Sequence, residues 1–181
     1  MNTFPIGEKL QSWLNSLPSS VPLRAVSSES STPEGVRLKE IIADSGLPSD
    51  SLVTAMLWLR LGIIEPAHEI VQNGSTPLAS YLHGVVHRLE GDYWNAKYWF
   101  RQVQDKQMLQ LISSTFVKGV EEEGLSEMAV SLKVMQRAAF SPAEFVSLHE
   151  HLYNQTKPTS QHIEATKRMA WIEWTSLWKL V

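Results

Sequence analysis

The sequence predicts an all-α fold of antiparallel helical hairpins, stacked as an irregular helical-repeat-like array or bundle. Apolar residues recur at helical spacing in nearly every segment, whereas no segment alternates between apolar and polar residues over the length of a strand. The connections between the predicted helices are short, which favours antiparallel neighbours. With 181 residues, the chain is long enough to bury one hydrophobic core without covalent cross-links.

Three parts are predicted along the chain. Residues 1–17 contain a short amphipathic helix that begins at Pro5, and its apolar face consists of Ile6, Leu10, Trp13 and Leu14. Residues 18–35 are rich in serine and proline and poor in large apolar side chains, so we predict a flexible linker. Residues 36–181 are then a single all-helical domain.

Nine helices are predicted within this domain from the spacing of its apolar residues. They cover residues 36–44, 51–61, 66–73, 76–90, 93–104, 109–122, 126–138, 142–153 and 161–180. Residues that cap helices mark several of the starts, since Asp92 precedes Tyr93 and Ser141 precedes Pro142.

A glycine followed five positions later by an alanine marks three of the predicted turns. The pairs are Gly62 with Ala67, Gly91 with Ala96, and Gly124 with Ala129. Glycine permits the turn, and alanine permits the second helix to approach closely. The repeated pattern therefore indicates hairpins of one kind.

The composition narrows the kinds of site that the chain can carry. Cysteine is absent, which excludes disulfides and thiolate sites and leaves histidine and carboxylate as the metal ligands. The 16 basic residues are dispersed among 19 acidic ones, so we expect no nucleic-acid partner. No secretory leader and no long apolar run is found, so we expect a soluble, cytoplasmic protein without a membrane partner.

Three polar side chains form a stripe along the predicted helix 76–90. His83, His87 and Glu90 are spaced i, i+4 and i+7, so they lie on one side of the helix, away from its apolar face. Two imidazoles one turn apart can chelate a divalent metal ion, and a carboxylate one turn on can act as a third ligand or as an orienting partner. Three roles stay open for the histidines: a structural network, contact with a ligand, and metal or acid–base chemistry.

Glu65 and His68 form an E-x-x-H pair on the preceding hairpin. Helical di-iron proteins use this spacing to direct both side chains at a metal, but they need a second such pair. Because Pro66 marks a helix start, we interpret Glu65 as an acidic residue of a first helical turn. His68 is kept as a third imidazole for a metal ion bound by His83 and His87.

The segment 84–100 resembles a tetratricopeptide unit. The residues at that motif's small, turn, aromatic, small and aromatic positions are Gly84, Gly91, Tyr93, Ala96 and Phe100. The large residues that the motif carries on its first helix are replaced by Ser80, His83 and His87. The resemblance implies that both histidines point inward, against the helix that begins at Tyr93.

Residues 83–99, which read HG-xx-HR-x-EGD-xx-NA-x-YW, also resemble the core shared by a family of uncharacterised proteins. Glu173 and Trp174 of the last predicted helix belong to this likeness. It implies no established activity.

Trp94, Tyr98 and Arg101 share the side of the next predicted helix that lies opposite Phe100. Aromatic and cationic side chains together suit an anionic or planar ligand or a protein partner. Packing of this side against the following helix is the favoured interpretation.

The last predicted helix carries tryptophans at i, i+3 and i+7, namely Trp171, Trp174 and Trp178. They either complete the domain's own core, which is favoured, or form a homodimer contact. His149 and His151 are two positions apart and point away from each other on a helix, and we expect both in solvent.

These observations favour a binding or interaction module whose ligand is a small molecule or a protein. Its ligand site is predicted at His83, His87, Glu90, Asp92, Asn95, Trp94, Tyr98 and Arg101. The alternative, which is less favoured, is a metal-dependent enzyme that binds a divalent ion through His83, His87, Glu90 and His68. The chain contains no phosphate-binding glycine loop, dinucleotide fingerprint, nucleophile elbow or H-E-x-x-H motif.

Overall fold

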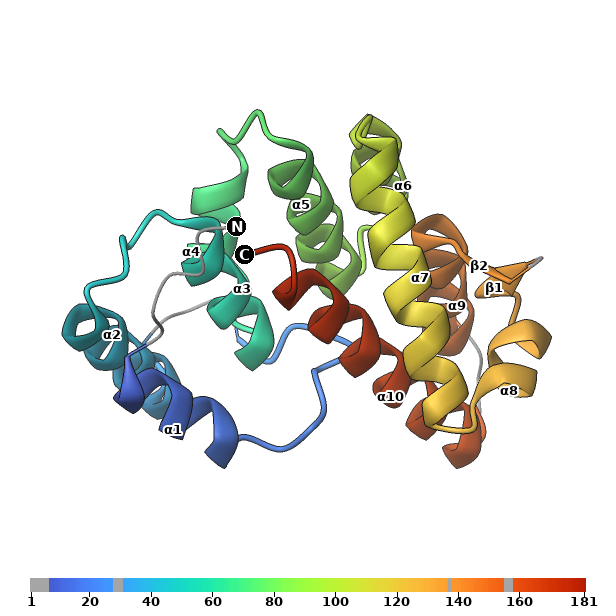
Figure 1. Cartoon of the computed structure of the whole chain (residues 1–181), viewed down its shortest axis with the longest axis horizontal. Helices are drawn as coiled ribbons and strands as arrows, with labels where there is room; N and C mark the ends of the chain where they lie inside the picture. Colours follow the sequence, from blue (N-terminus) through green and yellow to red (C-terminus); the bar gives the residue numbers. More distant parts are fainter. Residues whose placement is uncertain (1–6, 28–30, 137, 155–157) are drawn as a thin grey trace.

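The computed structural model describes residues 7–27, 31–136, 138–154 and 158–181 (Figure 1). Ten α-helices and one two-stranded hairpin form within these residues. In chain order they are α1 (Glu8–Ser16), α2 (Pro33–Ser45), α3 (Leu52–Leu61), α4 (Glu65–Val71), α5 (Pro77–Glu90), α6 (Tyr93–Gln102), α7 (Lys106–Glu122), α8 (Ser126–Ser131), β1 (Met135–Gln136), β2 (Ala139–Phe140), α9 (Pro142–Asn154) and α10 (Ser160–Trp178).

Helices that follow one another in the chain pack side by side over the first half of the molecule, from α1 through α6 (Figure 1). Beyond α6 the order changes, because α6 packs on α9 and α7 packs on α10. The predicted all-α array is confirmed, and its irregularity arises in this second half.

The three predicted glycine turns are confirmed. Gly62, Gly91 and Gly124 have φ angles of 71°, 86° and 66°, in the left-handed region that costs glycine little and other residues more. The alanines that follow them are fully buried, in the order Ala67, Ala96 and Ala129. The second helix of each hairpin therefore approaches its neighbour at a position where a larger side chain has no room.

The prediction of one helix over residues 126–138 is wrong. Helix α8 ends at Ser131, and a short antiparallel hairpin follows, in which Met135 pairs with Phe140. Lys133 adopts a φ of 61°, which ends the helix. Phe140 stacks on Phe116 of α7 at 3.9 Å, so burial of this ring favours the hairpin over a longer helix. Arg137 lies outside the described residues.

The N-terminal part of the chain joins the same hydrophobic core. Pro5 and Ile6, at the start of the first predicted helix, lie outside the described residues. Leu10 and Trp13 of α1 are buried in the core cluster that the later helices share. Helix α2 begins at Pro33, within the predicted linker.

Residues 18–27 of the predicted linker run across the array and make specific contacts. Leu23 is buried, and the Val26 N–H donates to the Gly62 carbonyl at 2.9 Å. The Arg60 guanidinium donates to the carbonyls of Pro18 and Ser20. Residues 28–30 lie outside the described part of the chain.

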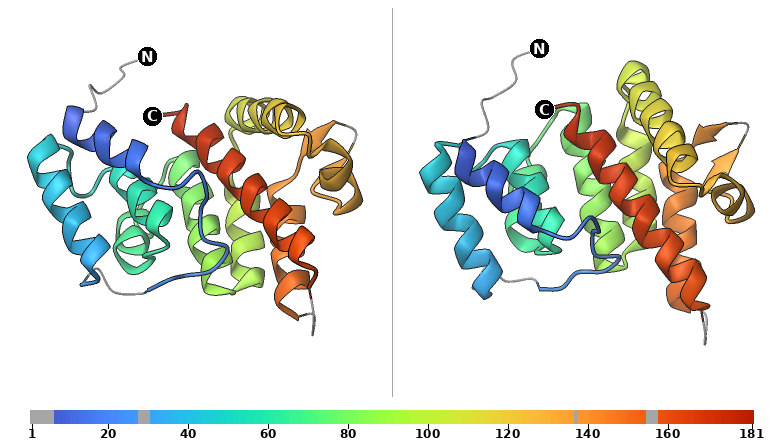
Figure 2. Two further views of the ribbon diagram at one scale, coloured as in Figure 1. Left: turned by 90° about the horizontal axis from the view of Figure 1, so that it is seen from below. Right: turned by 60° about the horizontal axis from the view of Figure 1, so that its bottom comes forward.

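Helix α10 crosses the array and packs on α7 (Figure 2). Trp174 is buried, and its indole N–H donates to the Met56 carbonyl of α3 at 3.4 Å. Trp171, Trp174 and Trp178 stack in succession, with ring centroids 5.3 and 4.9 Å apart. The favoured interpretation of this face as part of the core holds for Trp174, whereas Trp171 and Trp178 are half-buried.

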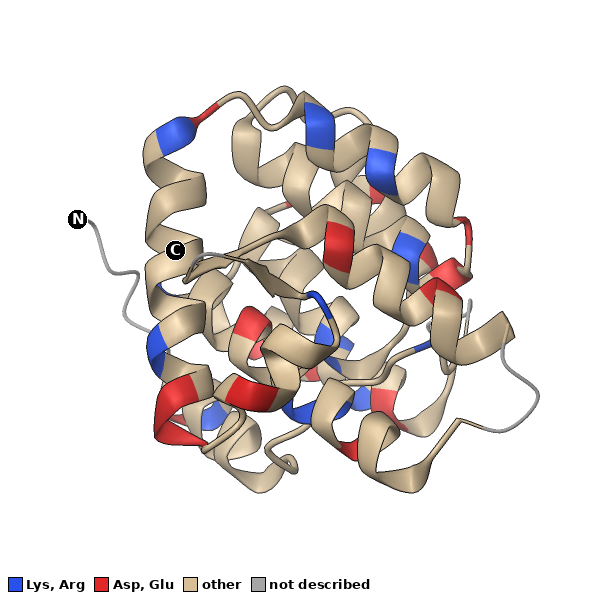
Figure 3. Cartoon of the chain, turned by 90° about the vertical axis from the view of Figure 1, so that its right-hand side faces the viewer, with Lys and Arg blue, Asp and Glu red and all other residues tan. Residues whose placement is uncertain are grey.

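Basic and acidic residues are interspersed over the side of the molecule that carries the hairpin (Figure 3). None of the described helices is both long enough and apolar enough to span a bilayer.

Candidate metal centre

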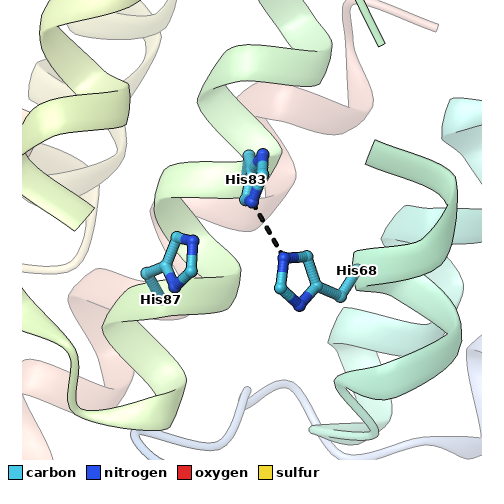
Figure 4. Close-up of side chains that lie close together, drawn as sticks. All are labelled: His68, His83 and His87. Carbon is cyan, nitrogen blue, oxygen red and sulfur yellow. Dashed lines mark hydrogen bonds between the residues drawn. The ribbon is translucent and has the colours of Figure 1, made fainter. Parts of the chain in front are cut away.

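Three histidines from two neighbouring helices converge at one place. His68 lies on α4, and His83 and His87 lie one turn apart on α5 (Figure 4). Each contributes a ring nitrogen, and these three nitrogens all lie within 4.8 Å of one another. The Nε2 atoms of His68 and His83 are 2.9 Å apart.

The local sequence explains how α4 and α5 present these rings to each other. Helix α5 begins with Pro77 in its first turn, and the Thr76 side chain accepts a hydrogen bond from the Ala79 N–H. At Gly74, in the turn before α5, an added Cβ would lie 2.5 Å from the Ala79 Cβ. Glycine and alanine therefore allow α4 and α5 to approach closely enough for their histidines to meet.

Glu90 lies at the outer edge of the cluster. One carboxylate oxygen accepts from Nδ1 of His87 at 2.8 Å, and the other lies 3.8 Å from Nδ1 of His68. A histidine whose Nδ1 proton is held by a carboxylate has its Nε2 lone pair free for a metal ion. Glu90 is therefore positioned to orient the imidazoles, and the three candidate metal ligands are all histidines.

His83 is held between two rings. It stacks on Trp99 of α6 at 3.9 Å with an interplanar angle of 20°, and on His87 at 4.8 Å with an angle of 18°. The pKa of His83 is lowered to about 4, chiefly by burial and in smaller part by the neighbouring imidazoles of His87 and His68. The ring is therefore neutral at neutral pH, the form that binds metal ions.

The spacing of the three nitrogens suits a single ion. Two nitrogens on a tetrahedral zinc, each about 2.0–2.1 Å from it, are about 3.3 Å apart. The distances here extend from 2.9 Å for His68 and His83 up to 4.8 Å for the widest pair. The tetrahedral separation of about 3.3 Å lies between these two distances.

The cluster is closed on one side and open on the other. His83 and His87 are 4% and 7% exposed, which confirms that both histidines are sheltered. The side chains of His68 and Glu90 are 33% and 28% exposed. An ion at this place would be reached from the side of His68 and Glu90.

The Nδ1 atom of His83 is buried and has no hydrogen-bond partner in the described structure. A ligating histidine usually donates its second ring nitrogen to an acceptor, as His87 does to Glu90. His83 is fixed by ring stacking instead, through Trp99.

Asp92 and Asn95 are hydrogen-bonded to each other at the start of α6. Asp92 caps α6 by accepting from the Asn95 N–H at 3.2 Å, and its other oxygen accepts from the Asn95 amide at 3.3 Å. Both bonds stabilise the start of α6. A ligand contact for these two residues stays a prediction.

Trp94, Tyr98 and Arg101 are exposed on α6, so the favoured interpretation that this side packs against the following helix is wrong. The Trp94 side chain is 74% exposed and Tyr98 is 41% exposed, and their rings stack at 6.2 Å. Helix α7, which follows α6 in the chain, packs against α10.

Sequence reasoning missed Trp99 as a site residue. Its signal was indirect, because it lies next to Phe100, one of the aromatic positions in the tetratricopeptide-like segment. An added Cβ on Gly84 would lie 3.0 Å from the Phe100 ring. A helix that presents Phe100 to Gly84 brings the neighbouring Trp99 towards His83, one position earlier on α5.

The expectation that His149 lies in solvent is wrong. His149 is 1% exposed, and its Nδ1 contacts the Phe145 carbonyl at 2.8 Å within α9. His151 is exposed, as expected.

Comparison of the chain with protein-family models, with curated proteins and with solved structures finds no match.

Proposed function

We propose that this protein binds one divalent transition-metal ion through His68, His83 and His87. The observation that supports the proposal is the convergence of three imidazole nitrogens within 4.8 Å of one another. Imidazole is a ligand for zinc, copper, iron and nickel, and calcium and magnesium prefer oxygen ligands. Zinc, which is most often tetrahedral, is the first candidate.

A bound ion would contribute free energy to the folded state alone, because the unfolded chain has no preformed site. Two of the imidazoles are already held in place: His83 stacks on Trp99, and Nδ1 of His87 is bonded to the Glu90 carboxylate.

Three protein ligands leave a fourth position of a tetrahedral ion for water or a substrate, which is the arrangement of catalytic zinc sites. The open side at His68 and Glu90 is where this position would face. A metal-bound water becomes acidic enough to act as a nucleophile near neutral pH. The proposed site therefore supports hydrolytic or hydration chemistry as well as simple binding.

A cavity of about 880 Å³ lies between α2, α3 and α4, with Trp58 and Ile70 among its lining residues. None of the predicted pocket residues His83, His87 or Asn95 lines it. The metal site therefore rests on the histidines alone, and a ligand pocket at residues 83–95 has less support.

The test uses protein made without a histidine tag, stripped with a chelator and then supplied with zinc. We expect one zinc ion per chain by elemental analysis, and a rise in melting temperature with zinc concentration. His68→Ala removes the most exposed of the three clustered imidazoles. It is expected to abolish both effects while the helical content is kept. His162→Ala, outside the cluster, is the matched control. Equal zinc binding by wild type and His68→Ala, or no zinc binding at all, would contradict the proposal.

A further inference from the structure

A continuous series of aromatic contacts joins the three-histidine site to the surface of the molecule. His83 stacks on Trp99 at 3.9 Å, and Trp99 meets Tyr98 edge to face at 5.6 Å. Tyr98 stacks on Trp94 at 6.2 Å with an interplanar angle of 11°. We call Trp99, Tyr98 and Trp94 the aromatic path.

The path leads outward step by step. Trp99 is half-buried, Tyr98 is 41% exposed, and Trp94, at the far end, is 74% exposed. Two of its members, Tyr98 and Trp94, are exposed on α6. The two exposed rings stack on each other, so they form one continuous aromatic surface at the outer end of the path.

Tryptophan and tyrosine share a property that other apolar side chains lack. They are the aromatic side chains most readily oxidised by one electron, and an electron passes quickly between rings in contact. Phenylalanine has similar shape and does not take part under the same conditions. The contacts from Trp99 through Tyr98 to Trp94 therefore place three readily oxidised rings in series.

We propose that the aromatic path carries oxidising equivalents from a redox-active ion in the three-histidine site to the protein surface. This inference rests on the proposed metal site and narrows its occupant to a redox-active ion, with copper as the probe. Copper is the divalent ion of its row that imidazole sites bind most tightly. The path would spare the ligating histidines from oxidation when peroxide reacts at the ion.

The electrons and protons balance as follows. Copper(I), formed by ascorbate, and Trp99 each give one electron to hydrogen peroxide, which takes two protons from water and leaves as two water molecules. Copper(II) and a Trp99 radical cation result. Tyr98 then gives Trp99 an electron and releases its phenolic proton. Trp94 reduces the Tyr98 radical, which regains a proton, and the radical cation of Trp94 is reduced by ascorbate at the surface.

The experiment loads the full chain with copper, measures the copper content, and then adds ascorbate and hydrogen peroxide. Oxidised residues are located by peptide mass spectrometry. In the wild type we expect copper-dependent oxidation at Trp94 and Tyr98 when ascorbate is limiting. In Trp99→Phe we expect oxidation at Trp94 to fall to the level of copper-free protein, while oxidation of His83 and His87 rises.

Tyr98→Phe provides a second interruption at an exposed position, where the fold tolerates the change. Here we expect oxidation to fall at Trp94 and to accumulate at Trp99. Trp94 has the same exposure in both variants, so oxidation by freely diffusing radicals would continue unchanged. Unchanged Trp94 oxidation in either folded, copper-loaded variant overturns the aromatic path and leaves the metal site intact. A wild type that binds zinc but no copper overturns the aromatic path alone, and a wild type that binds neither ion overturns both proposals.

Discussion

Arg88 of α5 and Glu173 of α10 form a two-pronged ion pair in the protein interior. The guanidinium nitrogens lie 3.0 and 2.5 Å from the two carboxylate oxygens, and both side chains are 3% exposed. The Tyr81 hydroxyl donates to the same carboxylate at 2.9 Å. Burial raises the pKa of Tyr81, with the Glu173 charge as a further cause, and this keeps its hydroxyl protonated as a donor.

Removing one partner of this pair is expected to destabilise the fold strongly. In Glu173→Gln the Arg88 charge stays buried without its counter-charge, which costs about 3–5 kcal/mol. Urea unfolding followed by circular dichroism measures the change. Replacement of both residues by apolar side chains, Arg88→Met with Glu173→Leu, is expected to recover most of the loss.

The exposed pair Lys118 and Glu122 is the control for this experiment. Its charged atoms are 3.7 Å apart on the surface of α7. Glu122→Gln is expected to change stability by less than about 1 kcal/mol. Similar losses for Glu173→Gln and Glu122→Gln would mean that the buried pair contributes no more than a surface contact.

His149 is expected to make stability depend on pH. Burial lowers the pKa of His149 to about 3 from 6.5, and the Arg88 charge adds to the shift. Between these two values the unfolded chain binds a proton that the folded protein excludes, so the free energy of unfolding falls as the pH is lowered from about 6.5 towards about 3. The slope from this one group is at most about 1.4 kcal/mol per pH unit.

Urea unfolding across this pH window tests the prediction. His149→Leu removes the titrating group and fills the same buried position, so its stability is expected to fall less steeply with acid than that of the wild type. Parallel curves for the two proteins would show that His149 takes up no proton on unfolding in this range.

Gly84→Ala is expected to destabilise the contact between α5 and α6. The added methyl would lie 3.0–3.1 Å from carbons of the Phe100 ring, which is itself held against Tyr81. Overpacking of this kind costs about 1–3 kcal/mol, more than the gain of about 1 kcal/mol from alanine's helix propensity. Phe100→Leu in the same chain is expected to relieve part of the cost, as a double-mutant cycle would reveal. Additive effects of the two substitutions would argue against a direct clash.

Glu90→Gln is expected to weaken metal binding without removing the site. The amide cannot hold the Nδ1 proton of His87 as strongly as the carboxylate does, and loss of such a partner lowers metal affinity by about 10–100-fold. Competition titration with a chromophoric chelator gives the affinity, and elemental analysis at saturating zinc gives an unchanged stoichiometry. Glu69→Gln, on the exposed side of α4, is the control and keeps the wild-type affinity. Loss of stoichiometry in Glu90→Gln would instead make Glu90 a direct ligand.

The helices and their turns could be predicted because they depend on short-range signals. Gly62, Gly91 and Gly124 indicate left-handed turns, because each lies at the end of a stretch with helical apolar spacing. The hairpin after α8 gave no such signal, since the left-handed positions there are occupied by Lys133 and Ala138. Only the burial of Phe140 against a distant helix explains why the chain bends at this point.

The histidine cluster was predictable in part for the same reason. His83 and His87 share a side of one helix, so their proximity follows from spacing alone, and His68 was added from a neighbouring E-x-x-H pair. Trp99, Arg88 and Glu173 depend on the pairing of helices. Arg88 and Glu173 are 85 positions apart, and no local pattern relates them. The exposure of Trp94 likewise depends on where α7 lies after α6.

The position of α10 has a consequence for how the chain matures during its synthesis. While residues up to α9 are being translated, Arg88 is made without its counter-charge and the Met56 carbonyl without the Trp174 indole. The earlier helices can form locally, but their shared interior stays open to water on the side that α10 later covers. The native state of these helices therefore forms only after α10 has left the ribosome, and until then the nascent chain exposes apolar surface of the kind that chaperones bind.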